Sequence, residues 1–345
     1  MNIGVLLINT GTPKEPTVEA IRPYLTEFLM DPYIISAPYL VRKCLVSHIV
    51  KNRPKRTVAH YQSFWTPEGS PFLLTSYKQQ KLLQEKLESL SSDNTYHVEL
   101  GMRYGEPNIQ QALEKLYDLK CKTLVLLPLY PQNVKVCAGT CFKEAYKQLS
   151  SPQLNNWRPK VLEITHFHHE EFYRLALAHQ VAKHWEYKPG SKLIVSFHST
   201  LLRDIKKDPT YLVQCKQTKE WLAQDLNIPA SDVILSFQSR FDSRKWLSPF
   251  TEHVLEELLA QNVKDICIVC PGFVADNIET MVEINQQLRA KTETKLMPGH
   301  IGDSRLQIID EVSHKVAFTY VPALEDSPEL IEALVQAIQK TVQDI

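Results

Sequence analysis

Side chains that can handle protons and divalent cations follow expected strands in the second half of the chain. His198 comes directly after the apolar run 193–197. Glu279, Glu283 and Gln287 are spaced four residues apart, so a helix would carry them on one polar stripe about 12 Å long. Imidazole and carboxylate suit first-row divalent metals, and a neutral imidazole also accepts protons near pH 7. The alternatives are a structural histidine that satisfies a loop carbonyl and a solvated helix face.

Position favours the functional interpretation of the polar stripe. Apolar residues occupy the opposite side of the same segment and can pack on a core, namely Ile278, Met281, Val282 and Ile284. The carboxylates therefore begin at a loop where a strand ends, which is where open α/β sheets bind their ligands.

Two cysteine pairs are weaker candidates for a metal site. Cys267 and Cys270 fall in an expected strand, where residues three apart point to opposite faces. Cys137 and Cys141 could share a helix face, but an iron–sulfur cluster usually takes four thiolates. No cysteine lies between Cys270 and Ile345. We expect no iron–sulfur cluster and no tightly bound cofactor.

A third candidate is the run 166–171, which contains three histidines and two glutamates. It directly precedes an amphipathic pattern, where acidic residues and histidines are common. We interpret it as the surface start of a helix.

The elements that would position these groups are short apolar runs that alternate with helical patterns. Such alternation predicts an α/β fold with parallel sheets. The expected strands cover residues 3–8, 97–100, 123–127, 192–197, 233–237 and 265–270. The expected helices cover residues 109–117, 173–185, 211–222 and 251–259.

The strands divide into two sets of three, which predicts two similar halves. We expect a first domain over residues 1–155, with a cleft-forming insertion at about 30–96, and a second domain over 156–320. Residues 321–345 are expected to hold a closing helix that packs back on the first domain. Its start is predicted by Ser327 as N-cap and Pro328 at the first helical position.

Composition narrows the class of protein. The 345 residues carry 39 basic and 39 acidic side chains, so no charge excess favours nucleic acid as a partner. The apolar run at residues 3–8 is too short for a signal peptide or a membrane span. Seven cysteines favour free thiols or metal ligands over a disulfide framework. We expect a cytoplasmic protein without a transmembrane segment. Two points stay open: whether the protein contacts a membrane peripherally, and whether it is a monomer or a dimer.

Taken in order, these motifs resemble the ferrochelatase family along nearly the whole chain. The residues that carry the resemblance are 4–9 with Gly11-Thr12-Pro13, the loop 65–71, Met102-Arg103-Tyr104-Gly105, residues 127–132, Ser196-Phe197-His198-Ser199, residues 237–241 with Trp246-Leu247, Cys270-Pro271-Gly272-Phe273, and then Asp276, Ile278-Glu279-Thr280 and Glu283.

The resemblance implies two Rossmann-like domains with a porphyrin cleft between them. It also implies a lyase of heme biosynthesis that inserts Fe²⁺, with the porphyrin and Fe²⁺ as substrates. His198 and Glu279 match the catalytic pair, and His198, Glu279 and Glu283 the metal-binding positions. The expected substrate-binding residues are Thr10, Tyr61, Trp65, Tyr130, Trp246, Phe273 and Asp276.

The chain departs from the family pattern at several positions near these residues. Asn277 stands where the family usually has histidine, Gln287 where it has an acid, and Thr10 where Leu, Met or Tyr is common. Asn133-Val134 replaces the usual Tyr-Ser.

Several functions fit this pattern. The match to the Gram-negative type favours protoporphyrin IX as the substrate, with coproporphyrin III as the alternative. A chelatase for another tetrapyrrole, such as sirohydrochlorin, would share the fold. A non-catalytic tetrapyrrole-binding protein would bind porphyrin without inserting metal.

Overall fold

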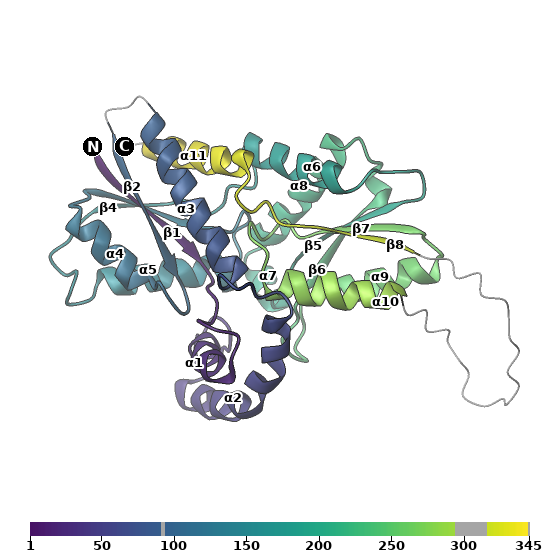
Figure 1. The fold of residues 1–345 in the computed structure, drawn as a ribbon, viewed down its shortest axis with the longest axis horizontal. Helices are drawn as coiled ribbons and strands as arrows, with labels where there is room; N and C mark the ends of the chain where they lie inside the picture. The colour runs from purple at the N-terminus through teal and green to yellow at the C-terminus, as the bar shows by residue number, and fades with distance from the viewer. Residues whose placement is uncertain (91–93, 294–315, 344–345) are drawn as a thin grey trace, which may run out of the picture.

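The structure is a computed structural model that describes residues 1–90, 94–293 and 316–343. Two four-stranded sheets, all of whose strands are parallel, form the two halves seen in Figure 1. The first has the order β2-β1-β3-β4, with β1 (Asn2–Asn9), β2 (Thr95–Met102), β3 (Thr123–Pro128) and β4 (Lys160–Glu163).

The second sheet repeats this arrangement. Its order is β6-β5-β7-β8, with β5 (Lys192–His198), β6 (Val233–Gln238), β7 (Asp265–Val269) and β8 (Ala317–Val321). The predictions of an α/β fold, parallel sheets and two similar halves are confirmed. All six expected strands exist, and each sheet has one further edge strand that the sequence did not reveal.

In the first half, helices cover both faces of the sheet because its strands are apolar on both sides. Successive side chains of β1 point to opposite faces of the sheet. Leu6 and Ile8 pack with α4 on one face, whereas Val5 and Leu7 belong to the core that includes α3 on the other. The helices are α1 (Val18–Leu29), α2 (Tyr39–Gln62), α3 (Pro71–Ser89), α4 (Ile109–Asp118), the π-helical turn η1 (Lys135–Gly139) and α5 (Thr140–Leu149).

In the second half, α9 and the π-helix η3 pack on one face of the sheet, and α6 and α8 contribute to the core on the other. The helices are α6 (Glu171–His184), α7 (Leu202–Lys207), α8 (Thr210–Asp225), the short η2 (Ala230–Asp232), α9 (Thr251–Ala260), η3 (Glu279–Leu288), α10 (Arg289–Glu293) and α11 (Pro328–Gln343).

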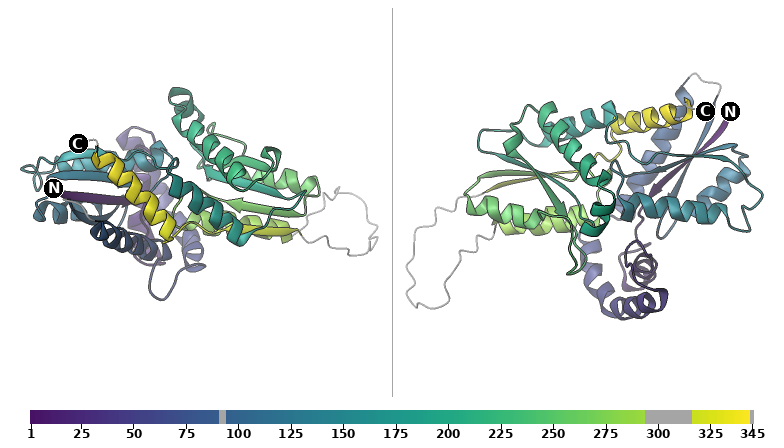
Figure 2. Two further views of the ribbon diagram at one scale, coloured as in Figure 1. Left: turned by 90° about the horizontal axis from the view of Figure 1, so that it is seen from above. Right: turned by 180° about the vertical axis from the view of Figure 1, so that it is seen from behind.

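The domain limits differ in detail from those expected. β4 pairs with β3, so residues 160–163 belong to the first sheet and not to the second domain. Within the expected insertion 30–96, α3 packs on the first sheet, whereas α2 contacts α1, which precedes the insertion. Together α1 and α2 project from the body as a lobe (Figures 1 and 2). An edge strand with exposed and half-buried residues carries a weak sequence signal, which explains the difference at β4.

The closing helix α11 joins the two halves. Ser327 Oγ accepts a hydrogen bond from Leu330 N at 3.3 Å, as expected of an N-cap. The helix packs against α3 of the first half and α6 of the second, on the side of the molecule opposite the α1–α2 lobe (Figure 2).

None of the helices in the described ranges is long and apolar enough to cross a bilayer.

Candidate active site

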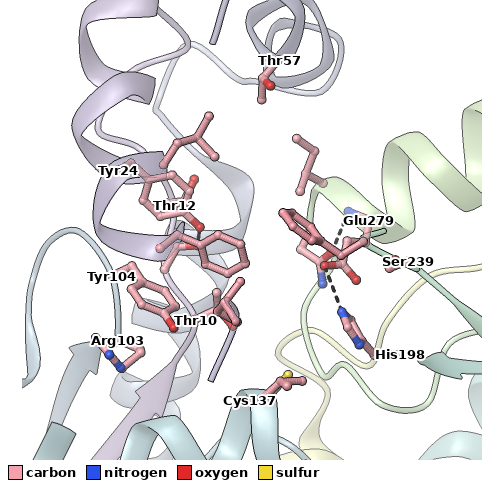
Figure 3. Close-up of a pocket in the computed structure, with 18 of the residues that line it drawn as sticks. Thr10, Thr12, Tyr24, Thr57, Arg103, Tyr104, Cys137, His198, Ser239 and Glu279 are labelled. Atoms are coloured by element: carbon pink, nitrogen blue, oxygen red, sulfur yellow. Dashed lines mark hydrogen bonds and ion pairs between the residues drawn. The ribbon is translucent and has the colours of Figure 1, made fainter. Parts of the chain in front are cut away.

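A cavity of about 780 Å³ lies where the α1–α2 lobe meets the strand ends of both halves. Figure 3 shows Thr10 and Tyr24 on one side of it and His198 and Glu279 on the other. This volume is within the range of small-molecule and cofactor sites.

The topology explains why the strand ends meet at this cavity. In the first sheet β2 and β3 lie on opposite sides of β1, and in the second sheet β6 and β7 lie on opposite sides of β5. A topological switch point therefore lies between β1 and β3, and another lies between β5 and β7. Loops leave such a point in opposite directions and open a crevice at the carboxyl ends of the strands. Thr10 follows β1 and Tyr130 follows β3, while His198 ends β5 and Phe273 follows β7. All four line the cavity.

The ring of His198 is oriented by the backbone. Its Nδ1 lies 2.5 Å from the carbonyl oxygen of Ser199, so the ring donates from Nδ1 and leaves the lone pair on Nε2. Tyr211 fixes the strand end by donating its hydroxyl to the His198 carbonyl at 2.8 Å. Nε2 lies 3.7 Å from Oε1 of Glu279, and only 19% of the His198 side chain is exposed.

Asn277, one of the positions at which the sequence departs from the family pattern, positions Glu279. Oδ1 of Asn277 accepts from Glu279 N at 2.8 Å and from Thr280 N at 3.3 Å, which caps the helix that carries Glu279. The second carboxylate oxygen, Oε2, is buried and has no hydrogen-bond partner among the described residues. Burial of a charged oxygen without a hydrogen bond is costly, so this oxygen favours a cation as its partner.

Glu283 lies next along the same helix. Its carboxylate accepts from Ser239 N at 2.9 Å and from Ser239 Oγ at 2.6 Å. Burial raises the pKa of Glu283, the bonds from Ser239 oppose this, and the negative charge of Glu279 adds to it. Within the described ranges, neither glutamate forms an ion pair with Lys or Arg.

The polar stripe expected from the sequence is present, although the segment is a π-helix. A π-helix has about 4.4 residues per turn, so residues four apart still lie near one line, as they do in an α-helix. Gln287 is exposed and lines a second cavity of about 420 Å³ together with Glu279 and Glu283. The stripe therefore runs from the main cavity towards the surface.

Five of the seven expected substrate-binding residues line the main cavity, namely Thr10, Tyr61, Tyr130, Trp246 and Phe273. Trp65 lies behind the wall, where its ring packs edge-on against Tyr61 with centroids 6.0 Å apart. Asp276 faces the protein interior, because its Oδ1 accepts from Thr280 Oγ1 at 3.0 Å, from Ala323 N at 3.3 Å and from the Tyr320 hydroxyl. Asp276 thus fixes the loop before Glu279 from behind.

Comparison with known proteins identifies the family. The family model described as Ferrochelatase matches residues 2–342. The chain is 39% identical over 343 residues to a ferrochelatase of Chromobacterium violaceum, covering 98% of this chain and 88% of that protein. It is 34% identical to a ferrochelatase of Teredinibacter turnerae, covering 99% and 87% of the two chains. The chain belongs to the ferrochelatase family. Membership assigns it to metal chelation in porphyrin and heme biosynthesis.

Solved structures of chelatases share the fold of this ferrochelatase-family chain. SirB from Bacillus subtilis, solved with Fe³⁺, aligns with a TM-score of 0.55 at 11% identity and covers 99% of this chain and 96% of that chain. The sirohydrochlorin chelatase SirB from Bacillus subtilis subspecies spizizenii, in complex with cobalt, aligns with a TM-score of 0.53 at 10% identity, covering 100% and 97%. At these identities the likeness concerns the fold alone.

The cavity of this ferrochelatase-family protein has a basic wall that the sequence analysis missed. His48, Asn52, Arg53, Arg56 and His60 of α2 line it at helical spacing. Their three-to-four-residue period could have revealed one polar face, but not that the face turns towards a ligand site.

A buried ion pair also borders the cavity in the first half. Arg103 and Asp31 form a salt bridge, and their side chains are 12% and 1% exposed. Asp31 further accepts from Thr140 Oγ1, from Tyr104 Oη at 3.0 Å and from Tyr33 N at 2.7 Å. Burial alone would raise the pKa of Asp31, but these hydrogen bonds and the Arg103 charge outweigh it and lower the pKa.

Proposed function

We propose that the protein inserts Fe²⁺ into a porphyrin, with protoporphyrin IX as the substrate. The observation that carries the proposal is the pair formed by His198 Nε2 and Glu279 Oε1, 3.7 Å apart at the wall of the cavity. First-row divalent metals bind such nitrogen and oxygen atoms at about 2.0–2.2 Å, so one ion could contact both. The unpartnered Oε2 of Glu279 supports the same role.

The geometry also supports a role for His198 in proton removal. Metal insertion releases the two protons of the pyrrole N–H groups. Because Nδ1 of His198 is occupied by the Ser199 carbonyl, the free lone pair on Nε2 faces the cavity and can accept a proton. A positioned base of this kind contributes about 100-fold or more to a rate.

Aromatic residues from both halves are suited to grip the macrocycle. Tyr130 and Tyr61 are buried aromatic residues on the first-half side of the cavity, and Trp246 and Phe273 lie on the other. An aromatic cleft of this kind can bend a flat ring with strain of about 1–5 kcal/mol drawn from binding.

The lining of the cavity offers both partners for the carboxylates of a porphyrin and an apolar surface for its ring. Arg53 and Arg56 can pair with the propionates at one edge of the ring. Leu25, Phe28 and Ile34 also line the cavity and offer carboxylates no partner. Protoporphyrin IX has two propionates and coproporphyrin III has four. The choice of protoporphyrin IX rests on the resemblance of residues 237–241 and 270–273 to the Gram-negative type of the family.

The polar stripe on η3 supports a path for the metal. Gln287 is exposed, Glu283 is half-buried and Glu279 reaches the main cavity. Loosely held oxygen ligands along one helix would allow a hydrated cation to approach while losing water stepwise. We assign this path to Fe²⁺ as the second substrate.

The test is an anaerobic assay of the purified protein with Fe²⁺ and either protoporphyrin IX or coproporphyrin III. We expect insertion into protoporphyrin IX to be faster. A large preference for coproporphyrin III would overturn the substrate assignment, and porphyrin binding without insertion of metal would identify a tetrapyrrole-binding protein instead. Turnover of sirohydrochlorin with neither porphyrin used would identify a different chelatase.

We further propose that the protein works without an iron–sulfur cluster and in the cytoplasm. All seven cysteines are free, and burial raises the pKa of both Cys137 and Cys141, which disfavours the thiolates that a cluster needs. Free thiols are typical of reducing compartments. The porphyrin-free protein should be colourless, and acid-labile sulfide in stoichiometric amount would contradict this.

A further inference from the structure

Three histidines gather outside the cavity, in the segment that connects the two halves. His166, His168 and His169 lie between β4 and α6, and one ring nitrogen from each lies within 4.8 Å of the others. They line a separate cavity of about 420 Å³ against α8, and this cavity shares no lining residue with the main one.

His168 is held as a metal ligand would be. Only 3% of His168 is exposed, and its Nε2 lies 3.1 Å from the side-chain oxygen of Gln217. Because an amide oxygen only accepts, the ring donates from Nε2 and keeps its lone pair on Nδ1. That Nδ1 is buried and has no hydrogen-bond partner among the described residues. Metal-binding histidines typically have the other ring nitrogen oriented in this way.

The surroundings of His168 leave little freedom to its ring. The ring stacks on Trp221 with centroids 5.7 Å apart and planes inclined by 25°. The backbone N–H of His168 donates to the Pro131 carbonyl at 3.0 Å, beyond the end of β3. Residues 166–171 lead into α6 as expected, but the expected surface position is wrong for His168, because this residue is buried.

The other two histidines also have partners that can orient them. Nδ1 of His166 lies 2.9 Å from Thr165 Oγ1, and Nε2 of His169 lies 3.4 Å from Oε1 of Glu170. The His169 side chain is 46% exposed, so solvent reaches the group. A metal bound to three nitrogens at about 2.0–2.1 Å needs them about 3.3 Å apart, a small closure for a half-exposed side chain.

We propose that His166, His168 and His169 bind a divalent first-row transition metal of the Zn²⁺ and Co²⁺ class. Imidazole is a preferred ligand for these ions, and three protein ligands leave the fourth position open to solvent. The site differs from the His198 site, which offers one imidazole among carboxylates, so the two should differ in metal preference. It is a second, accessory metal site.

The test uses Co²⁺, whose visible spectrum reports its ligands and geometry. A variant with His198→Ala and Glu279→Gln removes the main site, and we expect it to retain one equivalent of Co²⁺ with bands of four-coordinate cobalt. Adding His169→Ala, at a partly exposed position that should not disturb folding, should weaken the remaining binding by at least about 10-fold. Gln217→Met, which removes the acceptor that orients His168, should weaken it by about 10-fold.

The matched control is His179→Ala, at an exposed histidine on α6 outside the cluster, and it should leave Co²⁺ binding unchanged. Absence of any Co²⁺ in the variant that lacks the main site would overturn the proposal. So would a retained equivalent after His169→Ala, or equal losses in His169→Ala and His179→Ala, which would mean non-specific binding by surface histidines. None of these outcomes depends on turnover, so the proposal can fail while the proposed function holds.

Discussion

The two halves of the molecule share one topology but place different chemistry at the same edge. In each sheet the second strand in the order ends at the cavity, at Asn9 in the first half and at His198 in the second. The first half follows with hydroxyl and aromatic groups, where Thr10 Oγ1 and the Tyr130 hydroxyl are hydrogen-bonded to each other. The second half supplies an imidazole and two carboxylates. At the strand ends, the first half therefore offers neutral groups, and the second offers groups that titrate and bind metal.

Charge balance separates the halves further. Asp31 in the first half is paired with Arg103, and its pKa is lowered. Glu283 in the second half forms no ion pair among the described residues, and burial raises its pKa. A fully paired anion has no need of a cation, whereas closely spaced unpaired carboxylates gain by binding one. The comparison teaches that, of the two walls of the main cavity, the one from the second half is prepared to receive a divalent ion.

The largest expected effect is on stability in the first half. Asp31→Asn should lower the free energy of unfolding by about 3 kcal/mol, the lower end for breaking a buried pair, because Arg103 keeps only the longer contact with Glu144 Oε2 at 3.9 Å. Glu283→Gln, the matched change in the second half, should alter it by less than about 1 kcal/mol, because that carboxyl is not paired. Urea denaturation of both variants at pH 7 measures the difference. Equal losses would mean that the two carboxylates are structurally equivalent and would break the comparison.

The next effect is on chemistry in the second half. His198→Ala and Glu279→Gln should each reduce iron insertion by at least about 100-fold, the lower end for loss of a positioned proton-transfer group. Porphyrin affinity should change only a few-fold, because the aromatic groups that bind the ring remain. Single-turnover assays and fluorescence titration separate the two quantities. His184→Ala, at an exposed position on α6, serves as the control, and near-normal turnover of a folded His198→Ala protein at saturating substrates would refute the assignment.

The third effect is a pH dependence where the second half contacts α3. Glu325 accepts from Thr75 Oγ1 at 2.6 Å and from Asp276 N at 2.8 Å, and burial raises its pKa from 4.5 to about 7. Because the folded pKa is the higher one, its stabilising contribution is complete below pH 4.5 and is lost as the pH rises to about 7.

Glu325→Gln tests this dependence. From pH 5 to pH 8, the unfolding free energy of the wild type should fall by about 2–3 kcal/mol relative to that of the variant. Denaturation curves of both proteins at the two pH values give this difference. A constant difference would show that the carboxyl titrates at its ordinary pKa and that burial there has no electrostatic cost.

The smallest expected effect concerns the first-half wall. Tyr130→Phe removes the hydroxyl that contacts Thr10, and it should weaken porphyrin binding by less than about 10-fold without changing the turnover number. Fluorescence titration and a steady-state assay measure both, with Tyr117→Phe on α4 as the control. A collapse of turnover in Tyr130→Phe would assign chemistry to the first half and remove the division between the halves.

Much of the fold could be predicted from the sequence because its inner strands are continuous apolar runs. The first residue of α11 was predicted from Ser327 and Pro328, whose capping preferences are local. The edge strands β4 and β8 escaped notice because both contain half-buried or exposed residues, and their pairing depends on neighbours distant in sequence. The basic face of α2 was missed because periodicity does not tell which way a polar face turns.

By itself, the sequence determined that His198 ends a strand and that Glu279 and Glu283 share one stripe of a helix, since apolar runs and helical spacing are properties of a local segment. Only the tertiary structure decided that Glu279 comes within 3.7 Å of His198 and that Oε2 of Glu279 lacks a partner. It likewise decided that His168 is buried beside two other histidines. Such distances depend on how segments far apart in the chain pack against one another, and no local pattern encodes that packing.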